Sequence, residues 1–224
     1  MKLSIILLIG AAIAGAQTMS PPDPVAFRIP TVTLRVFGDG VVDGRSLTLA
    51  RRELADILGQ AGVSVLWHTC MSGFADWRST DPCQRDRQSA EFWVRIFNQK
   101  PAAVRPDVLA FAEIDDDLGM RSAGVYYSAI AETASRNGIP AGIVLGAALA
   151  HEVGHLVLGA NAHSHHGLMS PDWRREQFER LSSTGLSFSE KETRMLREEL
   201  TATRVAPSGD PPPPLHSAGP QPIN

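Results

Sequence analysis

The sequence predicts a mixed domain of the α/β or α+β class, built on a sheet of about five strands. Two observations lead to this prediction. Strand-like segments alternate along the chain with a segment whose apolar residues recur at helical spacing. In addition, residues 141–158 are apolar almost all the way round, which is typical of a helix buried in a core rather than one lying on the surface.

Most of the predicted strands lie in the first half of the chain. Residues 31–37 (TVTLRVF) are the first strand. Residues 46–60 carry apolar residues at helical spacing and end at Ala61-Gly62, which predicts a helix. After the first strand, the remaining strands are predicted at 63–67, 91–97, 108–114 and 124–130. For the third of the five strands, at 91–97, a helix over 85–98 is the alternative.

The second half of the chain is predicted to be mainly helical. Pro140 suits the start of the buried helix 141–158, and Gly159 suits the position just past its end. A charged segment at 174–181 and a final segment at 189–203 predict two further helices.

The last helix carries a recognisable start signal. Ser189 is followed three residues later by Glu192, which is the spacing of a capping box. Three apolar side chains of this helix are then expected to face the sheet subdomain: Met195, Leu196 and Leu200.

The amino terminus has the features of a signal peptide over residues 1–16. Lys2 precedes an apolar run, and Ala14-Gly15-Ala16 offers small residues at a cleavage site. We expect cleavage after Ala16 and a secreted or periplasmic protein that is not held in the membrane afterwards. An uncleaved anchor is the alternative. In an oxidising compartment, Cys70 and Cys83 are expected to form a disulfide that closes one loop.

Length and charge bound the rest. Residues 17–30 are interpreted as an amino-terminal extension and the proline-rich residues 206–224 as a disordered tail, which leaves 31–205 as a single domain. The formal net charge of -3 offers no basic surface for nucleic acid or for an anionic membrane. Nothing in the sequence indicates an oligomeric state.

The chemistry is concentrated in an H-E-x-x-H pattern on the buried helix. His151 and His155 are four residues apart, so both imidazoles can face one metal ion. Glu152 lies beside them, where it can hold a water molecule without occupying a ligand position. Three buried polar side chains need partners, and a metal ion with its bound water is the simplest partner that satisfies all three. An ordinary core helix with two hydrogen-bonded histidines is the alternative.

The order of residues after this pattern resembles the metzincin branch of zinc-dependent metallopeptidases. In that family the helix ends at a glycine, a third histidine follows, and a methionine turn lies beneath the metal. Here Gly159 comes one residue late and His163 two residues late, because Leu158 and Asn161 occupy the usual positions. Met169 would be the methionine of the turn. The resemblance covers about residues 31–170.

The resemblance implies one zinc ion per chain, held by His151, His155 and His163, with Met169 as an apolar floor. His163 is favoured because Gly159 can end the helix and four residues suffice to bring the chain back. The other side chains that compete for the third ligand position are His165, His166, Glu176, Glu179 and Glu190.

The resemblance also implies a fold: a twisted mixed sheet with the active-site helix in an amino-terminal subdomain (31–159) and a small, mainly helical carboxy-terminal subdomain (160–205). In the family the fourth strand is antiparallel, lies at the sheet edge and pairs with an extended peptide substrate. Residues 108–114 take this place by order, and an ordinary edge strand is the alternative. One of Tyr126 and Tyr127 is expected to pack in the core, and the other is a candidate to face the cleft.

The predicted function is therefore that of an exported zinc metallopeptidase, an endopeptidase-type hydrolase of peptides or proteins. Glu152 would act as general base on a water held by the metal. A different class is a non-catalytic exported binding domain with a structural zinc. Such a closed site would use a fourth ligand such as His166. A zincin acting on a non-peptide amide is a third possibility.

Overall fold

The computed structural model describes residues 29–38, 40–71, 81–84, 90–115 and 120–205. The predicted signal peptide with its cleavage site, most of the amino-terminal extension, and the tail 206–224 lie outside the described residues.

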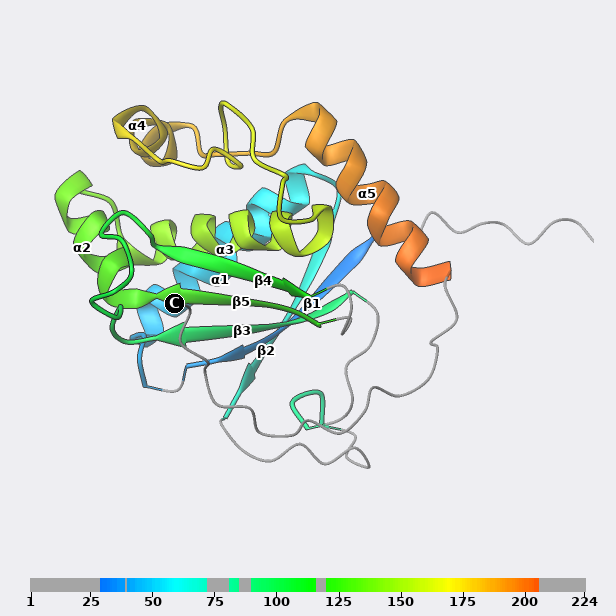
Figure 1. The fold of residues 1–224 in the computed structure, drawn as a ribbon, viewed down its shortest axis with the longest axis horizontal. Coiled ribbons are helices and arrows are strands. Elements are labelled where there is room, and N and C mark those ends of the chain that lie inside the picture. Colours follow the sequence, from blue (N-terminus) through cyan, green and yellow to red (C-terminus); the bar gives the residue numbers. More distant parts are fainter. Residues whose placement is uncertain (1–28, 39, 72–80, 85–89, 116–119, 206–224) are drawn as a thin grey trace, which may run out of the picture.

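A five-stranded mixed sheet forms the base of the molecule (Figure 1). In spatial order the strands are β2 (Ser64–Cys70), β1 (Thr31–Phe37), β3 (Glu91–Phe97), β5 (Met120–Tyr126) and β4 (Ala110–Asp115). The first three pairings are parallel, whereas β4 runs antiparallel to β5 at the edge of the sheet. The edge position and antiparallel direction expected of the fourth strand are confirmed.

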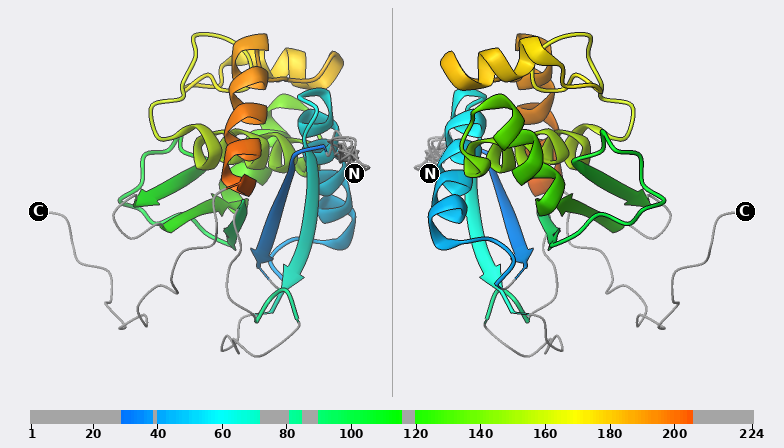
Figure 2. Two further views of the ribbon diagram at one scale, coloured as in Figure 1. Left: turned by 90° about the vertical axis from the view of Figure 1, so that its right-hand side faces the viewer. Right: turned by 90° about the vertical axis from the view of Figure 1, so that its left-hand side faces the viewer.

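The helices form further layers on one side of the sheet. Helix α1 (Gly44–Gln60) and the central helix α3 (Ala141–Leu158) pack against each other and against the strands. Helix α4 (Arg175–Ser183) lies on the far side of α3 from the sheet (Figure 2). Helix α5 (Glu190–Val205) also contacts α3, so α3 is enclosed between the sheet and the carboxy-terminal helices.

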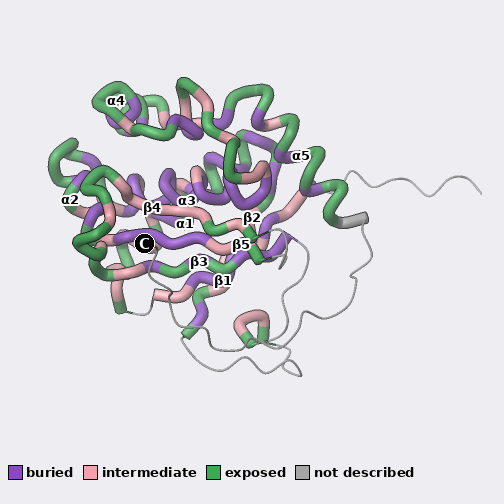
Figure 3. Tube along the Cα trace, viewed as in Figure 1, coloured by how far each residue is buried: buried purple, intermediate pink, exposed green. Residues whose placement is uncertain are grey.

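Helix α3 lies at the centre of the hydrophobic core. It is buried along most of its length (Figure 3), as its apolar sequence predicted. By length and composition alone α3 could cross a membrane, but 78% of it is buried inside the protein, which is what a core helix shows. The helix begins after Pro140 and ends before Gly159, which has a φ of 96°. Both predicted helix ends are confirmed.

Two glycines of α3 allow α1 to approach closely. A Cβ atom on Gly146 would lie 2.6 Å from the carbonyl oxygen of Ala50, and one on Gly142 would collide with the carbonyl oxygen of Ser46. Because Gly142 and Gly146 are four residues apart, they form one flat strip along α3. The backbones of the two helices therefore meet where a side chain would otherwise separate them.

We expect Gly146→Ala to lower the free energy of unfolding by about 1–3 kcal/mol, because the added methyl group overpacks the α1–α3 contact. Gly59→Ala is the matched control. Gly59 lies in α1 with open space around it, so alanine there should be neutral or raise stability by about 0.5–1 kcal/mol. Urea unfolding of the two variants measures both values. Equal effects of the two substitutions would contradict the close-packing explanation.

One predicted strand was partly wrong. The segment 124–130 was expected to be extended, but β5 ends at Tyr126 and the chain continues as helix α2 (Tyr127–Asn137). The two tyrosines and Ile130 favour a strand locally. Helix formation wins because it buries Ile130 and Ala134, four residues apart, and because Gly138 closes the helix in a left-handed conformation.

The carboxy-terminal helix begins as predicted. The Glu192 carboxylate accepts a hydrogen bond from the Ser189 backbone N–H at 2.6 Å, and the Glu192 N–H donates to the Ser189 hydroxyl at 3.3 Å. This is the predicted capping box. Leu196 and Leu200 are buried as expected, whereas Met195 is 37% exposed, because it lies on the solvent side of the helix.

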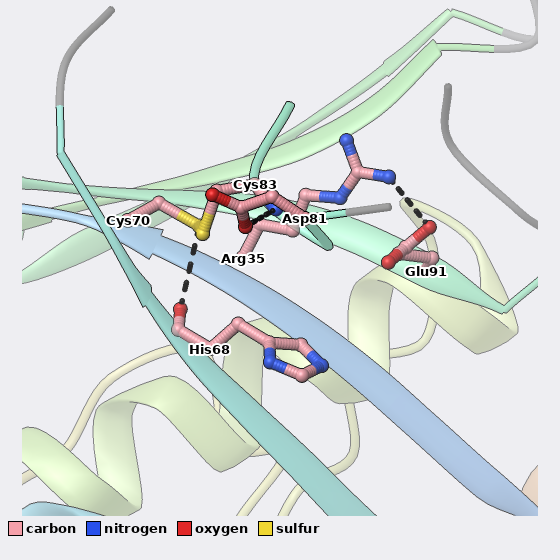
Figure 4. Close-up of polar contacts among 6 residues, drawn as sticks. All are labelled: Arg35, His68, Cys70, Asp81, Cys83 and Glu91. Carbon is pink, nitrogen blue, oxygen red and sulfur yellow. Dashed lines mark hydrogen bonds and ion pairs between the residues drawn. A yellow bond between two sulfur atoms is a disulfide. The ribbon is translucent and has the colours of Figure 1, made fainter. Parts of the chain in front are cut away.

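The sheet face opposite the helices carries the predicted disulfide. Cys70, the last residue of β2, is bonded to Cys83 (Figure 4). On the same face, Arg35 of β1 donates a 2.9 Å hydrogen bond to the Glu91 carboxylate of β3, and both side chains are 1% exposed. A buried ion pair must be well hydrogen-bonded to offset its loss of hydration, so this pair ties two neighbouring strands in one register.

Candidate metal centre

Three histidines converge at the carboxy-terminal end of α3. His151 and His155 lie one turn apart on the helix, and His163 comes from the loop that follows it. The Nε2 atom of His155 lies 3.1 Å from Nε2 of His151 and 3.0 Å from Nε2 of His163. One nitrogen from each ring lies within 4.8 Å of the others, and the described residues contain no other such group of three potential ligands.

The backbone determines which nitrogen of the two helical histidines faces this point. Nδ1 of His151 lies 2.8 Å from the carbonyl oxygen of Leu168, and Nδ1 of His155 lies 3.3 Å from that of Gly159. A carbonyl oxygen only accepts, so each Nδ1 must carry the proton of a neutral imidazole. Both Nε2 atoms then present bare lone pairs to each other.

A shared cation explains this arrangement. Two lone pairs 3.1 Å apart repel unless a positive charge lies between them. In a tetrahedral zinc site with bonds of about 2.0–2.1 Å, ligand nitrogens lie about 3.3 Å apart. The two separations from Nε2 of His155, 3.1 and 3.0 Å, are close to that spacing, and all three ligand nitrogens lie within 4.8 Å of one another. The three side chains therefore fit a metal ion of this kind.

The charge state of the histidines also suits a metal. Burial lowers the pKa of His151 to about 4, against a smaller rise from its bond to Leu168, and burial likewise lowers the pKa of His155. Both imidazoles are therefore neutral at pH 7. Neutral imidazole is the form that binds a metal, so no proton has to be removed from these two rings before binding.

Glu152 lines the same cleft and is only 5% exposed. Burial raises its pKa from the ordinary value of 4.5 to about 8. Without a metal the carboxyl group is thus protonated at neutral pH, and a nearby positive charge would favour its ionised form. The protonation state of the Glu152 carboxyl group would therefore depend on whether a metal ion is bound nearby. A carboxyl group of this kind is suited to accept and release a proton in the cleft.

These values predict a pH dependence of the metal-free protein. Because the pKa of Glu152 is about 8 when folded and 4.5 when unfolded, its contribution to stability is present below pH 4.5 and is lost as the pH rises through 8. We expect Glu152→Gln to remove this loss and to stabilise the metal-free protein, by on the order of 3 kcal/mol more at pH 8 than at pH 5.

Urea unfolding in the presence of a chelator measures this difference. His151 acts in the opposite sense, because its contribution is lost as the pH falls from 6.5 toward 4. That contribution is common to both proteins and cancels in the comparison. A variant whose stability parallels the wild type at every pH would show that Glu152 is not held in its neutral form.

Met169, the methionine of the predicted turn, is fully buried. It packs against Gly154, inside the H-E-x-x-H pattern. A Cβ atom on Gly154 would collide with the Met169 sulfur and lie 2.9 Å from its methyl carbon. Met169 therefore packs directly against α3 at the H-E-x-x-H pattern. Gly154 was not singled out from the sequence, although a residue without a side chain inside the pattern is a signal for such a contact.

Trp173 is a second residue that the sequence analysis missed. Its indole N–H donates to the Leu168 carbonyl oxygen at 3.1 Å, which is the same oxygen that accepts from His151. Its ring also lies edge-on to the His151 ring, with centroids 6.1 Å apart. Trp173 thus helps to hold the orientation of His151. The acceptor of this hydrogen bond is a backbone carbonyl oxygen, which no residue pattern marks, so only the folded structure shows the contact.

The remaining candidate ligands lie outside the group of three. His165, His166, Glu176, Glu179 and Glu190 are all exposed. His166 in particular does not join the other histidines, so the structure does not form the four-histidine closed site. Tyr126 packs against Phe97 and Phe111, and the Tyr127 hydroxyl contacts Asp43, so neither tyrosine lines the cleft.

A cleft of about 1560 Å³ opens above the histidines. One wall consists of the loop before β4, β4 itself and α2, and the other consists of the loop after Met169 and α4. His151, Glu152, His155 and His163 all line it. The cleft is larger than the roughly 300–1,000 Å³ of a typical small-molecule pocket.

Fold and site together define an α/β protein with a three-histidine candidate metal site on its core helix. No protein-family model matches the sequence, and no curated protein matches it. Among solved structures, the chain is similar to metalloproteinase-II from Bacteroides fragilis, with a TM-score of 0.48 and 16% sequence identity. The match covers 77% of this chain and 54% of that chain, so this chain spans about half the length of that protein.

Proposed function

We propose that the protein is a zinc-dependent metallopeptidase that hydrolyses peptide bonds. The observation that carries this proposal is the convergence of three histidine nitrogens beside a buried carboxyl group in an open cleft. His151, His155 and His163 would hold one zinc ion. When bound, zinc supplies a Lewis acid that lowers the pKa of water and stabilises negative charge on oxygen.

The residues of the chain divide the other tasks among them. Glu152 accepts a proton from the attacking water and passes it to the leaving amine, because it lies beside the histidines in the same cleft. The carbonyls of Leu168 and Gly159 keep the histidine rings in the orientation that directs Nε2 into the cleft. Met169 supports the ligands from below without taking part in the chemistry.

A peptide substrate is favoured by the wall of the cleft. Ala110, Phe111 and Ala112 of β4 line it, and β4 pairs with β5 on one side only among the described strands. The other edge of β4 can therefore offer backbone N–H and C=O groups to an extended chain. A non-peptide amide would use neither this edge nor the length of the cleft.

Export is part of the same proposal. The Cys70–Cys83 disulfide suits an oxidising compartment, and the amino-terminal sequence has the features of a cleavable signal peptide. The proposed location of the protein is therefore secreted or periplasmic, where it is not held in the membrane.

Hydrolysis of an unfolded protein substrate tests the function. The purified chain should cleave it, lose activity in a zinc chelator and regain activity when stoichiometric zinc is added. Loss of the fold in chelator without any activity to lose would favour the non-catalytic binding domain instead. Cleavage of small amides but no peptide would point to the third class of function.

A further inference from the structure

Arg121 contacts the end of the helix that carries two of the histidines. It lies near the start of β5, paired with Ile114 of β4, on the strand face that also carries the buried Ala123 and Val125. From there its Nη1 atom donates to the carbonyl oxygen of Leu156 at 2.7 Å and lies 3.5 Å from that of Val157. These carbonyls directly follow His155.

The last carbonyls of a helix have no partner within the helix, so the end of α3 needs external donors. The Gly159 N–H donates to the carbonyl oxygen of His155 at 2.8 Å. The Arg121 guanidinium group donates to the carbonyl oxygens of the next two residues, Leu156 and Val157. The guanidinium group also places a permanent positive charge at the negative end of the helix dipole. Three consecutive carbonyls are thereby satisfied where α3 stops.

The point where α3 stops determines the positions of two of the three histidines. The carbonyl oxygen of Gly159 lies 3.3 Å from Nδ1 of His155 and so orients that ring. The chain then turns, with the Ala162 N–H donating to Gly159, and delivers His163 directly after. A fraying last turn would displace the carbonyl that holds His155 and the loop that carries His163.

We infer that Arg121 is a positioning residue of the metal centre, holding the end of α3 so that His155 and His163 meet His151. This inference rests on the proposed metal site but concerns a residue on another strand, 35 positions away in sequence from its carbonyl partner. Arg121 is not one of the three converging histidines and does not line the cleft. It acts through backbone carbonyls.

Metal affinity tests the inference. We expect Arg121→Met, which keeps an unbranched apolar stem but removes the guanidinium donors, to raise the zinc dissociation constant about tenfold, as loss of an outer-shell partner typically does. Arg121→Lys keeps a charge and a donor and should recover part of the affinity. Arg95→Met is the matched control, because Arg95 is an exposed arginine on the neighbouring strand β3.

Competition with a chromophoric chelator gives the dissociation constants, and the visible spectrum of the cobalt-substituted protein reports the ligand geometry. A change in both for Arg121→Met, partly reversed in Arg121→Lys and absent in Arg95→Met, supports the inference. A lower thermal midpoint of the metal-free protein with unchanged affinity and spectrum would overturn it, because it would show a purely structural role.

Two other outcomes have separate meanings. A wild-type chain that binds neither zinc nor cobalt overturns the proposed function, and the inference with it. If the wild-type chain binds metal, and Arg121→Met and Arg121→Lys bind it as tightly as the wild type does, the inference alone is overturned. If Arg121→Met does not fold, Arg121→Lys against wild type gives the same comparison.

Discussion

Replacing Glu152 by glutamine is expected to reduce peptide hydrolysis by about 10²–10⁴-fold, the contribution that a positioned general base typically makes. Glutamine has nearly the same size and can fill the same buried position, but it cannot accept the proton of the attacking water. Because Glu152 is not one of the three converging ligands, zinc content should stay at the wild-type value. Steady-state hydrolysis and metal analysis of the same preparation measure the two effects.

The matched control is Glu176→Gln, an identical substitution on the exposed surface of α4. It should change neither hydrolysis nor metal content. A Glu152→Gln protein that hydrolyses peptides at the wild-type rate would remove Glu152 from the mechanism. A variant that loses its zinc together with its activity would instead make Glu152 part of the metal site.

The second large effect is expected from the histidines themselves. His155→Ala should abolish stoichiometric zinc binding, because its Nε2 is the nitrogen that approaches both of the others. Loss of a direct ligand should exceed the roughly 10–100-fold cost of losing an outer-shell partner. Zinc analysis after dialysis, with one zinc per wild-type chain as the reference, measures this loss. His165→Ala, an exposed histidine of the same loop, is the control.

His163→Ala identifies the third ligand. Its nitrogen converges with the other two in the structure, so this variant should lose zinc as His155→Ala does. Retention of zinc in His163→Ala alone would assign the third position to a side chain from the loop or from a later helix. A wild-type chain that takes up no metal would show that the H-E-x-x-H pattern serves only to build the core.

Much of the candidate site could be predicted because its signals are local. His151, Glu152 and His155 lie within five consecutive residues of a helix whose apolar sequence and flanking Pro140 and Gly159 mark it clearly. The delayed position of His163 was also accommodated as expected. A turn between Gly159 and Ala162 takes up the extra residues and leaves Asn161 exposed.

Other features depended on which segments lie side by side. Residues 127–130 favour a strand by composition, and only burial of Ile130 and Ala134 against the rest of the protein makes them helical. The close approach of α1 to Gly142 and Gly146 likewise requires both helices to be in place.

The sequence by itself determined the H-E-x-x-H pattern, the helix that carries it and the cysteine pair, since each is specified by residue type and short spacing. Only the tertiary structure decided how the histidine rings are held. The carbonyl that orients His151 comes from Leu168, 17 residues away, and the donor that holds the helix end comes from Arg121, 35 residues from its partner. A backbone carbonyl has no side-chain signature, so contacts of this kind become visible only when folding brings distant segments together.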